Sequence, residues 1–279
     1  MRSASPCPIN ASPTKHTKQN GDLLWFMCLV CFVGIQLPKV RSPPAQSEPR
    51  YLVGDLEGLP LVSEAGSRDA APMHAAAEKH LIRTDAVLAG IIRKVGPCAL
   101  KPEPWRSPFQ SLVQAVAHQQ LNGKAAETIL GRFRALFSGK RFPQPKAIAG
   151  VSDEALRAAG FSRAKVAAIR DIAARVVSGE IPGARRIEKL SDDEIIERLT
   201  AARGVGRWTV EMLLMFQLGR PDVMPADDFG VRSGYRIAYG LDEMPKPRQL
   251  LEASEPWRPH RTVAAWYLWR AVDLAKQGA

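Results

Sequence analysis

From about residue 76 to the end of the chain, hydrophobic positions recur with the spacing of α-helices. Ser107 and Pro108 suit an N-cap and a first helical position, and the apolar residues that follow stand at i, i+3, i+4 and i+7. These apolar residues are Phe109, Leu112, Val113 and Val116. A second helix is predicted over about 123–137. Three serines each precede a further apolar repeat and are predicted to open helices in the same way: Ser152, Ser162 and Ser191.

The helix after Ser191 carries a capping box, because Glu194 stands three residues after the serine. Between turn residues, no stretch alternates apolar and polar positions with a period of two. The sequence therefore predicts an all-α fold with short connections between its helices.

The N-terminal region has a different character. It is polar and rich in proline and serine, except for an apolar run at 23–37. The run's apolar core of roughly 13–15 residues is shorter than the ~20 that span a membrane, and no small-x-small cleavage site follows it. We interpret residues 1–75 as an extension outside the fold, disordered or arising from a start codon assigned too early. A membrane anchor through 23–37 is the alternative.

Charge adds a prediction about partners. The chain has 39 Lys and Arg against 28 Asp and Glu, which gives a net charge of +11 and a pI of about 9.8. Such a surplus attracts polyanions, so nucleic acid or an anionic membrane becomes a candidate partner. The alternative is a soluble protein that is merely basic. Cys28 and Cys31 form a CxxC, but the sequence offers no second half for a zinc site.

A Gly-Val-Gly turn links two apolar repeats between Leu199 and Phe216. Gly204 and Gly206 permit positive φ and a close approach of the backbone to a ligand. Gly206 also stands where the second helix begins, and free N–H groups at such an end favour an anion. We therefore expect a DNA phosphate at this turn, bound by Gly204, Val205, Gly206, Arg207 and Thr209. An ordinary αα-hairpin is the alternative.

Several separated motifs resemble one family. The run LTAARGVGRWTVEMLLMF is similar to the hairpin of the helix-hairpin-helix superfamily of base-excision DNA glycosylases. The stretch MPADDFGVR is most similar to the DNA-3-methyladenine glycosylase II family. The runs FQSLVQAVAHQQLNGKAA and EPWRPHRTVAAWYLWRAV resemble that family's DNA-facing helix with its turn and its closing helix. The resemblance covers residues 76–279, with the hairpin at about 191–218.

The resemblance implies a two-lobed helical glycosylase fold with the active site in the cleft between the lobes. It implies hydrolysis of the N-glycosidic bond of 3-methyladenine and 7-methylguanine in double-stranded DNA, by a monomer expected in the cytoplasm with the nucleoid. Two other functions stay open. One is a helix-hairpin-helix glycosylase for another lesion or mispair, and the other is a DNA-binding protein without catalysis.

By motif position Asp228 is the expected catalytic carboxylate, which would stabilise oxocarbenium character on the sugar. Its neighbour Asp227 is expected to cap the helix that begins near Phe229, and the reverse assignment stays open. Trp208 occupies the position of the lysine nucleophile of bifunctional members, so water is the expected nucleophile and the strand stays uncut. No cysteine follows Cys98, so no iron–sulfur cluster, metal or other cofactor is expected. A monovalent cation at the hairpin stays open.

The motifs also suggest a base pocket and a wedge. Trp266, with Tyr267, is the expected wall for a cationic base, through a cation–π interaction. The other tryptophans near the motifs are expected in the core: Trp208, Trp257 and Trp269. Gln120 and Leu121 are both candidates for the wedge that holds the DNA stack open. Further phosphate contacts are expected from four basic residues: Lys124, Arg203, Arg207 and Arg232.

Overall fold

The computed structural model describes residues 74–103, 107–137 and 141–277. Within these residues every regular element is a helix, as the sequence predicts. The α-helices are α2 (Ala75–Thr84), α3 (Ala86–Val95), α4 (Pro108–His118), α5 (Gly123–Ala135), α6 (Asp153–Ala158), α7 (Arg163–Ser178), α8 (Ala184–Ile187), α9 (Asp192–Thr200), α10 (Arg207–Phe216), α11 (Phe229–Ala238), α12 (Pro247–Ala253) and α13 (Arg261–Gln277). Two 3-10 helices join them, η1 (Pro145–Gly150) and η2 (Glu255–Trp257).

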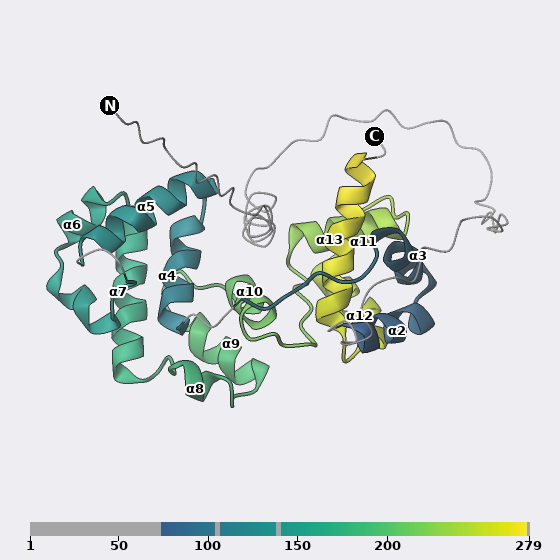
Figure 1. Ribbon diagram of the computed structural model, residues 1–279, viewed down its shortest axis with the longest axis horizontal. Helices are drawn as coiled ribbons and strands as arrows, with labels where there is room; N and C mark the ends of the chain where they lie inside the picture. The colour runs from purple at the N-terminus through teal and green to yellow at the C-terminus, as the bar shows by residue number, and fades with distance from the viewer. Residues whose placement is uncertain (1–73, 104–106, 138–140, 278–279) are drawn as a thin grey trace, which may run out of the picture.

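The helices form two lobes (Figure 1). Helices α4 to α9 make the first lobe, and α2, α3 and α11 to α13 make the second, with α10 between them. The chain therefore starts in the second lobe, crosses to the first and returns, so that α2 and α3 pack against the C-terminal α13. This two-lobed all-α architecture agrees with the sequence prediction.

The serine caps are confirmed. Ser107, Ser152 and Ser162 each accept a hydrogen bond from the backbone N–H three residues later. At α9 the predicted capping box is complete, because Ser191 N–H donates to Glu194 at 2.8 Å while Glu194 N–H donates to Ser191 Oγ at 3.3 Å. Each such cap contributes about 1 kcal/mol to stability. Both partners of each cap lie within four consecutive residues, so the cap can be predicted from the local sequence.

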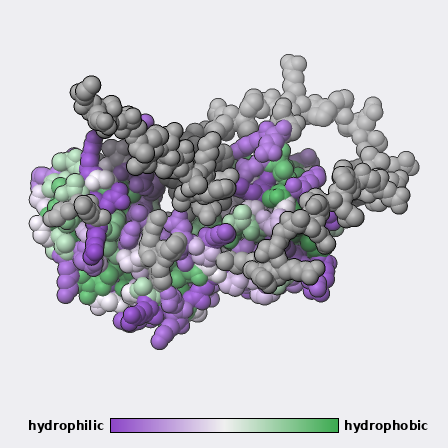
Figure 2. All heavy atoms as spheres, viewed as in Figure 1, coloured by the Kyte–Doolittle hydropathy of each residue, from purple (hydrophilic) through white to green (hydrophobic). Residues whose placement is uncertain are grey.

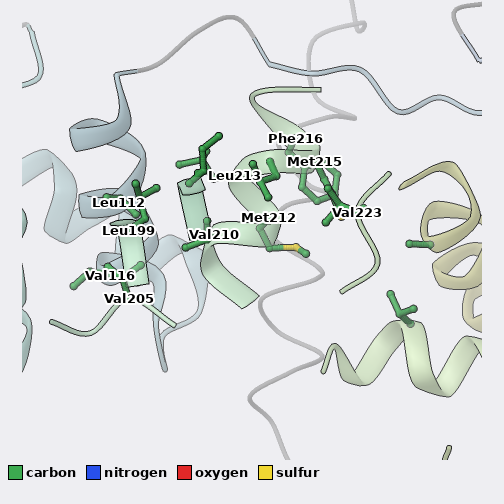
Figure 3. Close-up of a cluster of buried hydrophobic side chains, with 14 of the residues drawn as sticks. Leu112, Val116, Leu199, Val205, Val210, Met212, Leu213, Met215, Phe216 and Val223 are labelled. Atoms are coloured by element: carbon green, nitrogen blue, oxygen red, sulfur yellow. The ribbon is translucent and has the colours of Figure 1, made fainter. Parts of the chain in front are cut away.

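Helix α10 is buried on all sides from its third residue onward. Figure 3 shows its side chains meeting Leu112 and Val116 of α4 at one end of an apolar cluster and Val223 at the other. From Val210 to Phe216 every residue except Glu211 is apolar, and a helix of this composition belongs in the interior. Helix α10 thus joins the cores of the two lobes, with its first turn at their junction.

The closest helix crossing of the second lobe joins α11 to α13. A Cβ built on Gly234 would lie 1.9 Å from the Leu268 carbonyl oxygen, so only glycine allows the two backbones to approach this closely. This crossing fixes the N-terminus of α11, and with it Asp228, against one face of α13.

On the face shown in Figure 2, hydrophilic side chains alternate with apolar patches. Among the described helices, none is both long enough and apolar enough to cross a bilayer. The apolar run at 23–37, and with it the proposed extension 1–75, lies outside the described residues apart from His74 and Ala75.

Candidate active site

The predicted hairpin is formed by α9 and α10. Gly204 has a φ of 76°, which requires the left-handed freedom of glycine. Gly206 instead has a φ of −91° and is the N-cap of α10, where no side chain caps the first amides. Those amides remain available to an anion beside the exposed Arg207. Of the other predicted phosphate ligands, Val205 and Thr209 have buried side chains. The Val205 N–H already donates to Ala202 O at 3.1 Å, so of these two only the Thr209 N–H could serve.

Asp228 is the N-cap of α11, and its side chain is only 1% exposed. Its Oδ1 accepts a hydrogen bond from Val231 N–H at 2.7 Å. The expectation that Asp227 caps this helix is therefore wrong: α11 begins at Phe229, so the residue directly before it takes the cap position. Asp227 is exposed, and one aspartate combines the cap with the predicted catalytic position.

Two indoles hold the same carboxylate. Trp208 Nε1 donates to Asp228 Oδ2 at 2.8 Å, and Trp269 Nε1 donates to Oδ1 at 2.9 Å. Trp208 comes from the first turn of α10 and Trp269 from α13, so the carboxylate joins the hairpin helix to the second lobe. Together with the cap, three N–H donors fix its orientation. Trp269 lies in the core, as predicted, and Trp208 packs against the core; both indoles also contact the candidate catalytic residue.

Gly230 allows this arrangement. A Cβ at this position would lie 2.9 Å from Trp269 Cδ1 and 3.1 Å from Asp228 Oδ1, closer than real Cβ contacts. The Trp269 ring also stacks on Phe216 of α10, with ring centroids 5.9 Å apart. The indole is thus held on one side by α10 and on the other by the first turn of α11.

The two aromatic residues predicted to line the base pocket are both buried on α13. Tyr267 is completely buried, and its hydroxyl donates to Glu78 Oε1 or Gly96 O at 2.9 and 3.0 Å. Trp266 is 4% exposed and packs against Arg270, whose guanidinium lies 5.4 Å from its ring centroid. Neither makes a hydrogen bond to Asp228. Trp266 and Trp269 stand about one turn apart on α13, and Trp269 is the one that contacts the first turn of α11 and the carboxylate.

The predicted wedge lies in the turn between α4 and α5. Gln120 is exposed and has a φ of 60°, the only positive value among the non-glycine residues that the structure describes. Leu121 is half-buried. The side chain of Gln119 donates to Gly204 O at 2.9 Å, which places this turn beside the hairpin although the two are 85 residues apart. Exposure favours Gln120 over Leu121 as the residue that can enter DNA.

The four basic residues expected at phosphates do not share one environment. Lys124, Arg203 and Arg207 are exposed. Arg232, however, is half-buried, and its Nε donates to Pro245 O at 2.7 Å. This contact fixes Arg232 within the second lobe, so it is a weaker candidate for DNA than the other three.

Glu211 is a charged residue near the site that the sequence patterns did not reveal. It lies on α10 with 4% exposure, and Arg207 Nε donates to its Oε1 at 3.0 Å. Burial raises the pKa of Glu211 to about 7, and the charges of Asp227 and Asp228 act in the same direction. Within the described residues, no three His, Cys, Asp or Glu side chains are grouped as metal ligands would be.

Comparison with known proteins gives a consistent family. Residues 113–259 match the HhH-GPD superfamily base excision DNA repair protein family. DNA-3-methyladenine glycosylase 1 of Schizosaccharomyces pombe is 44% identical over 204 residues, which cover 71% of this chain and 88% of that protein.

Two solved structures are similar along nearly their whole length. The S. pombe 3-methyladenine DNA glycosylase Mag1, in complex with abasic DNA, gives a TM-score of 0.65 at 43% identity and covers 72% of this chain and 98% of Mag1. The Bacillus halodurans DNA-3-methyladenine glycosidase gives a TM-score of 0.68 at 36% identity, over 74% of this chain and 94% of the other. On its sequence match and its fold, the chain belongs to the HhH-GPD superfamily of base excision DNA repair proteins.

Proposed function

We propose that the protein is a monofunctional DNA glycosylase that removes alkylated purines, such as 3-methyladenine and 7-methylguanine, from double-stranded DNA. The observation that carries this proposal is the Asp228 carboxylate, fixed by Val231 N–H and two indole N–H groups beside the hairpin. The names and DNA complex of the similar proteins support the same substrate class.

Asp228 would act on the sugar. As the bond from C1′ to the base nitrogen breaks, its electron pair moves to the base and neutralises the positive charge that alkylation placed there. Positive charge then develops at C1′, where a carboxylate stabilises it. The oxygen of water forms the new bond to C1′ and loses a proton, for which Asp228 is a candidate acceptor.

Strand cleavage is not expected from this arrangement. A lyase reaction needs an amine nucleophile at C1′, and the position behind the hairpin is occupied by Trp208. The indole N–H instead donates to the carboxylate, so it supports the hydrolytic residue rather than attacking the sugar. We propose water as the nucleophile, with no cofactor or metal in the reaction.

Trp208 is a further candidate for recognition of the base, beside Trp266 and Tyr267. An aromatic face attracts a cationic base, and Trp208 is half-buried and joined to Asp228, whereas Trp269 lies between Phe216 and Gly230. The exposed Gln120 would fill the gap left in the stack, and the amides of the Gly204 to Arg207 turn would hold a phosphate of the same DNA. Nothing in this scheme requires more than a monomer.

Base release from methylated duplex DNA tests the proposal. The wild type is expected to release free 3-methyladenine and 7-methylguanine and to leave the strand intact until alkali is added. The Asp227→Asn variant, changed at an exposed site, should keep a rate within about threefold of wild type, whereas Asp228→Asn should lose at least about 100-fold.

Two results would contradict the proposal. Trapping of the protein on DNA by borohydride would show a Schiff base and exclude the monofunctional reaction. Loss of activity in Asp227→Asn with full activity in Asp228→Asn would exchange the roles of the two aspartates.

A further inference from the structure

We propose that Lys165 is a positioning residue for base eversion, because from α7 it holds the wedge turn in a fixed place relative to the phosphate-binding hairpin. The wedge turn is defined here as residues 118–122, between α4 and α5. This inference rests on the proposed glycosylase function and adds a residue outside the motifs that indicated it.

The Lys165 ammonium closes the C-terminal end of α4. Its Nζ donates to Ala117 O at 3.0 Å and to Gln119 O at 2.7 Å. Carbonyls in the last turn of a helix have no partner within the helix, and a positive charge at this end is favourable. The lysine is half-buried, and burial lowers its pKa. The half-buried ammonium group is therefore stabilised by its two carbonyl acceptors rather than by solvent.

The same face of α7 also supports the hairpin. Asp171 Oδ2 accepts a hydrogen bond from Arg203 N–H at 2.7 Å. Between the two polar residues lies Ala168, and a Cβ built on Gly204 would be 3.2 Å from the Ala168 Cβ. Residues spaced by three along a helix share a side, so Lys165, Ala168 and Asp171 form one continuous support.

A direct tie completes the link between the two turns. Gln119 Nε2 donates to Gly204 O at 2.9 Å, while the Gln119 carbonyl is the acceptor closest to Lys165. The wedge turn and the hairpin are therefore joined both to each other and to α7. Any shift of the wedge turn along the DNA axis would have to break contacts on both sides.

The backbone of the wedge turn gives a reason for this support. Gln120 has a φ of 60°, a conformation that costs a non-glycine residue about 1 kcal/mol or more. Strained residues of this kind persist where the surrounding structure fixes them. The carbonyls held by Lys165 lie directly before Gln120, so the ammonium maintains the conformation that leaves the Gln120 side chain exposed.

The expected consequence concerns the eversion step. A wedge must hold its position while the base leaves the stack, and eversion costs most for a well-paired base and least for an unpaired one. Removal of the Lys165 charge should therefore slow base release mainly when the lesion is paired. Hydrolysis at Asp228, whose N–H donors come from α10, α11 and α13, should be little affected.

The test compares single-turnover base release from two duplexes that contain the same alkylated purine. In one duplex the lesion is paired, and in the other it lies opposite an abasic-site analogue. Lys165→Met is expected to lose about tenfold on the paired lesion and at most about twofold on the unpaired one. Lys165→Arg, which keeps a donor with positive charge, should recover most of the loss. Arg163→Met removes an exposed charge from the first turn of the same helix and should match wild type on both duplexes.

Gln119→Leu provides a second route if Lys165→Met folds poorly. It removes the tie to Gly204 from a half-buried position and should show the same selective loss on the paired lesion. Equal losses on both duplexes, or no loss on the paired one, would overturn the positioning role. A wild-type protein that releases no base from either duplex would instead overturn the proposed function itself.

Discussion

The side chains of Asp228 and Asp85 have similar hydrogen-bond environments. Each caps a helix, α11 and α3, by accepting backbone N–H groups from the first turn. Each also accepts a hydrogen bond from an indole. Trp257 Nε1 donates to Asp85 Oδ2 at 3.0 Å, with the Tyr239 hydroxyl as a further donor, and Asp228 receives Trp208 and Trp269. Local hydrogen bonding therefore does not separate a catalytic carboxylate from a structural one.

The difference lies in which elements supply the donors. The side-chain partners of Asp85 come from η2 and from Tyr239, directly after α11, so the group joins elements of the second lobe only. One indole at Asp228 comes from α10, directly behind the hairpin. Asp228 is also followed by Phe229, which is 45% exposed, and a second buried carboxylate, Glu211, lies near it. Asp228 is therefore distinguished by its position between the lobes, beside the predicted phosphate-binding turn. Its hydrogen-bond partners alone do not distinguish it from Asp85.

The largest effect on stability is expected from a substitution that disturbs the surroundings of both aspartates. In Gly234→Ala the new Cβ would lie 1.9 Å from a backbone oxygen, so α11 and α13 must separate. We expect a loss of more than about 4 kcal/mol in the free energy of unfolding, measured by urea denaturation, and no stable native protein at 37 °C. Gly131→Ala in α5 is the matched control, because no atom lies within 4 Å of its Cβ. Native stability in Gly234→Ala would show that the crossing is not needed.

Asp85→Ala should affect stability alone. It removes the cap of α3 and leaves the buried Trp257 N–H without an acceptor, for a combined loss of about 2–3 kcal/mol. Base release per folded molecule, with the folded fraction taken from circular dichroism, should stay within about twofold of wild type. A rate loss in the folded fraction would mean that Asp85 has a role in the site.

Glu211 adds a pH dependence to the stability of the protein. Its folded-state pKa of about 7 lies above the unfolded value of about 4.5, so the folded state holds the proton more tightly. The Glu211 carboxyl therefore does not reduce the free energy of unfolding below about pH 4.5. Its ionisation reduces that free energy progressively as the pH rises from about 4.5 to 7. With allowance for the exposed Arg207 partner, Glu211→Gln should gain about 2 kcal/mol on wild type between pH 5 and pH 8. Parallel stability curves for the two proteins would contradict this.

The smallest effects are expected when one indole donor is removed from each aspartate, Trp269 from Asp228 and Trp257 from Asp85. Trp269→Phe removes the N–H to Asp228 but keeps an aromatic ring, and should slow base release about tenfold, or 1.4 kcal/mol. Trp257→Phe removes the corresponding N–H to Asp85 and should lower the melting temperature without changing the rate. If both variants changed the rate, or both changed only the melting temperature, the distinction between Asp228 and Asp85 would be contradicted.

The sequence predicted what depends on neighbouring residues. The serine caps and the capping box require contacts across three residues, and the structure confirms them. The Asp-Asp pair before Phe229 left the cap uncertain by one position, because either carboxylate can serve a helix whose first residue is not known. Motif position nevertheless pointed to Asp228.

Other site residues depend on contacts that no local pattern encodes. Which tryptophan of α13 faces Asp228 is decided by the crossing at Gly234 and Leu268. The contacts of Lys165 join residues 46 and 48 positions apart, in a segment whose apolar repeat predicts only a helix. Glu211 could be recognised as unusual only once α10 was known to be buried on every side.

The matched pair Asp228→Asn and Asp85→Asn tests the central claim most directly. Both substitutions keep the shape of the side chain and its capping oxygen while removing the charge. Single-turnover release of 3-methyladenine per folded molecule should fall at least about 100-fold in Asp228→Asn. Asp85→Asn should keep a wild-type rate per folded molecule and lose stability. A rate for Asp228→Asn within about threefold of wild type would contradict the assignment of Asp228 as the catalytic carboxylate.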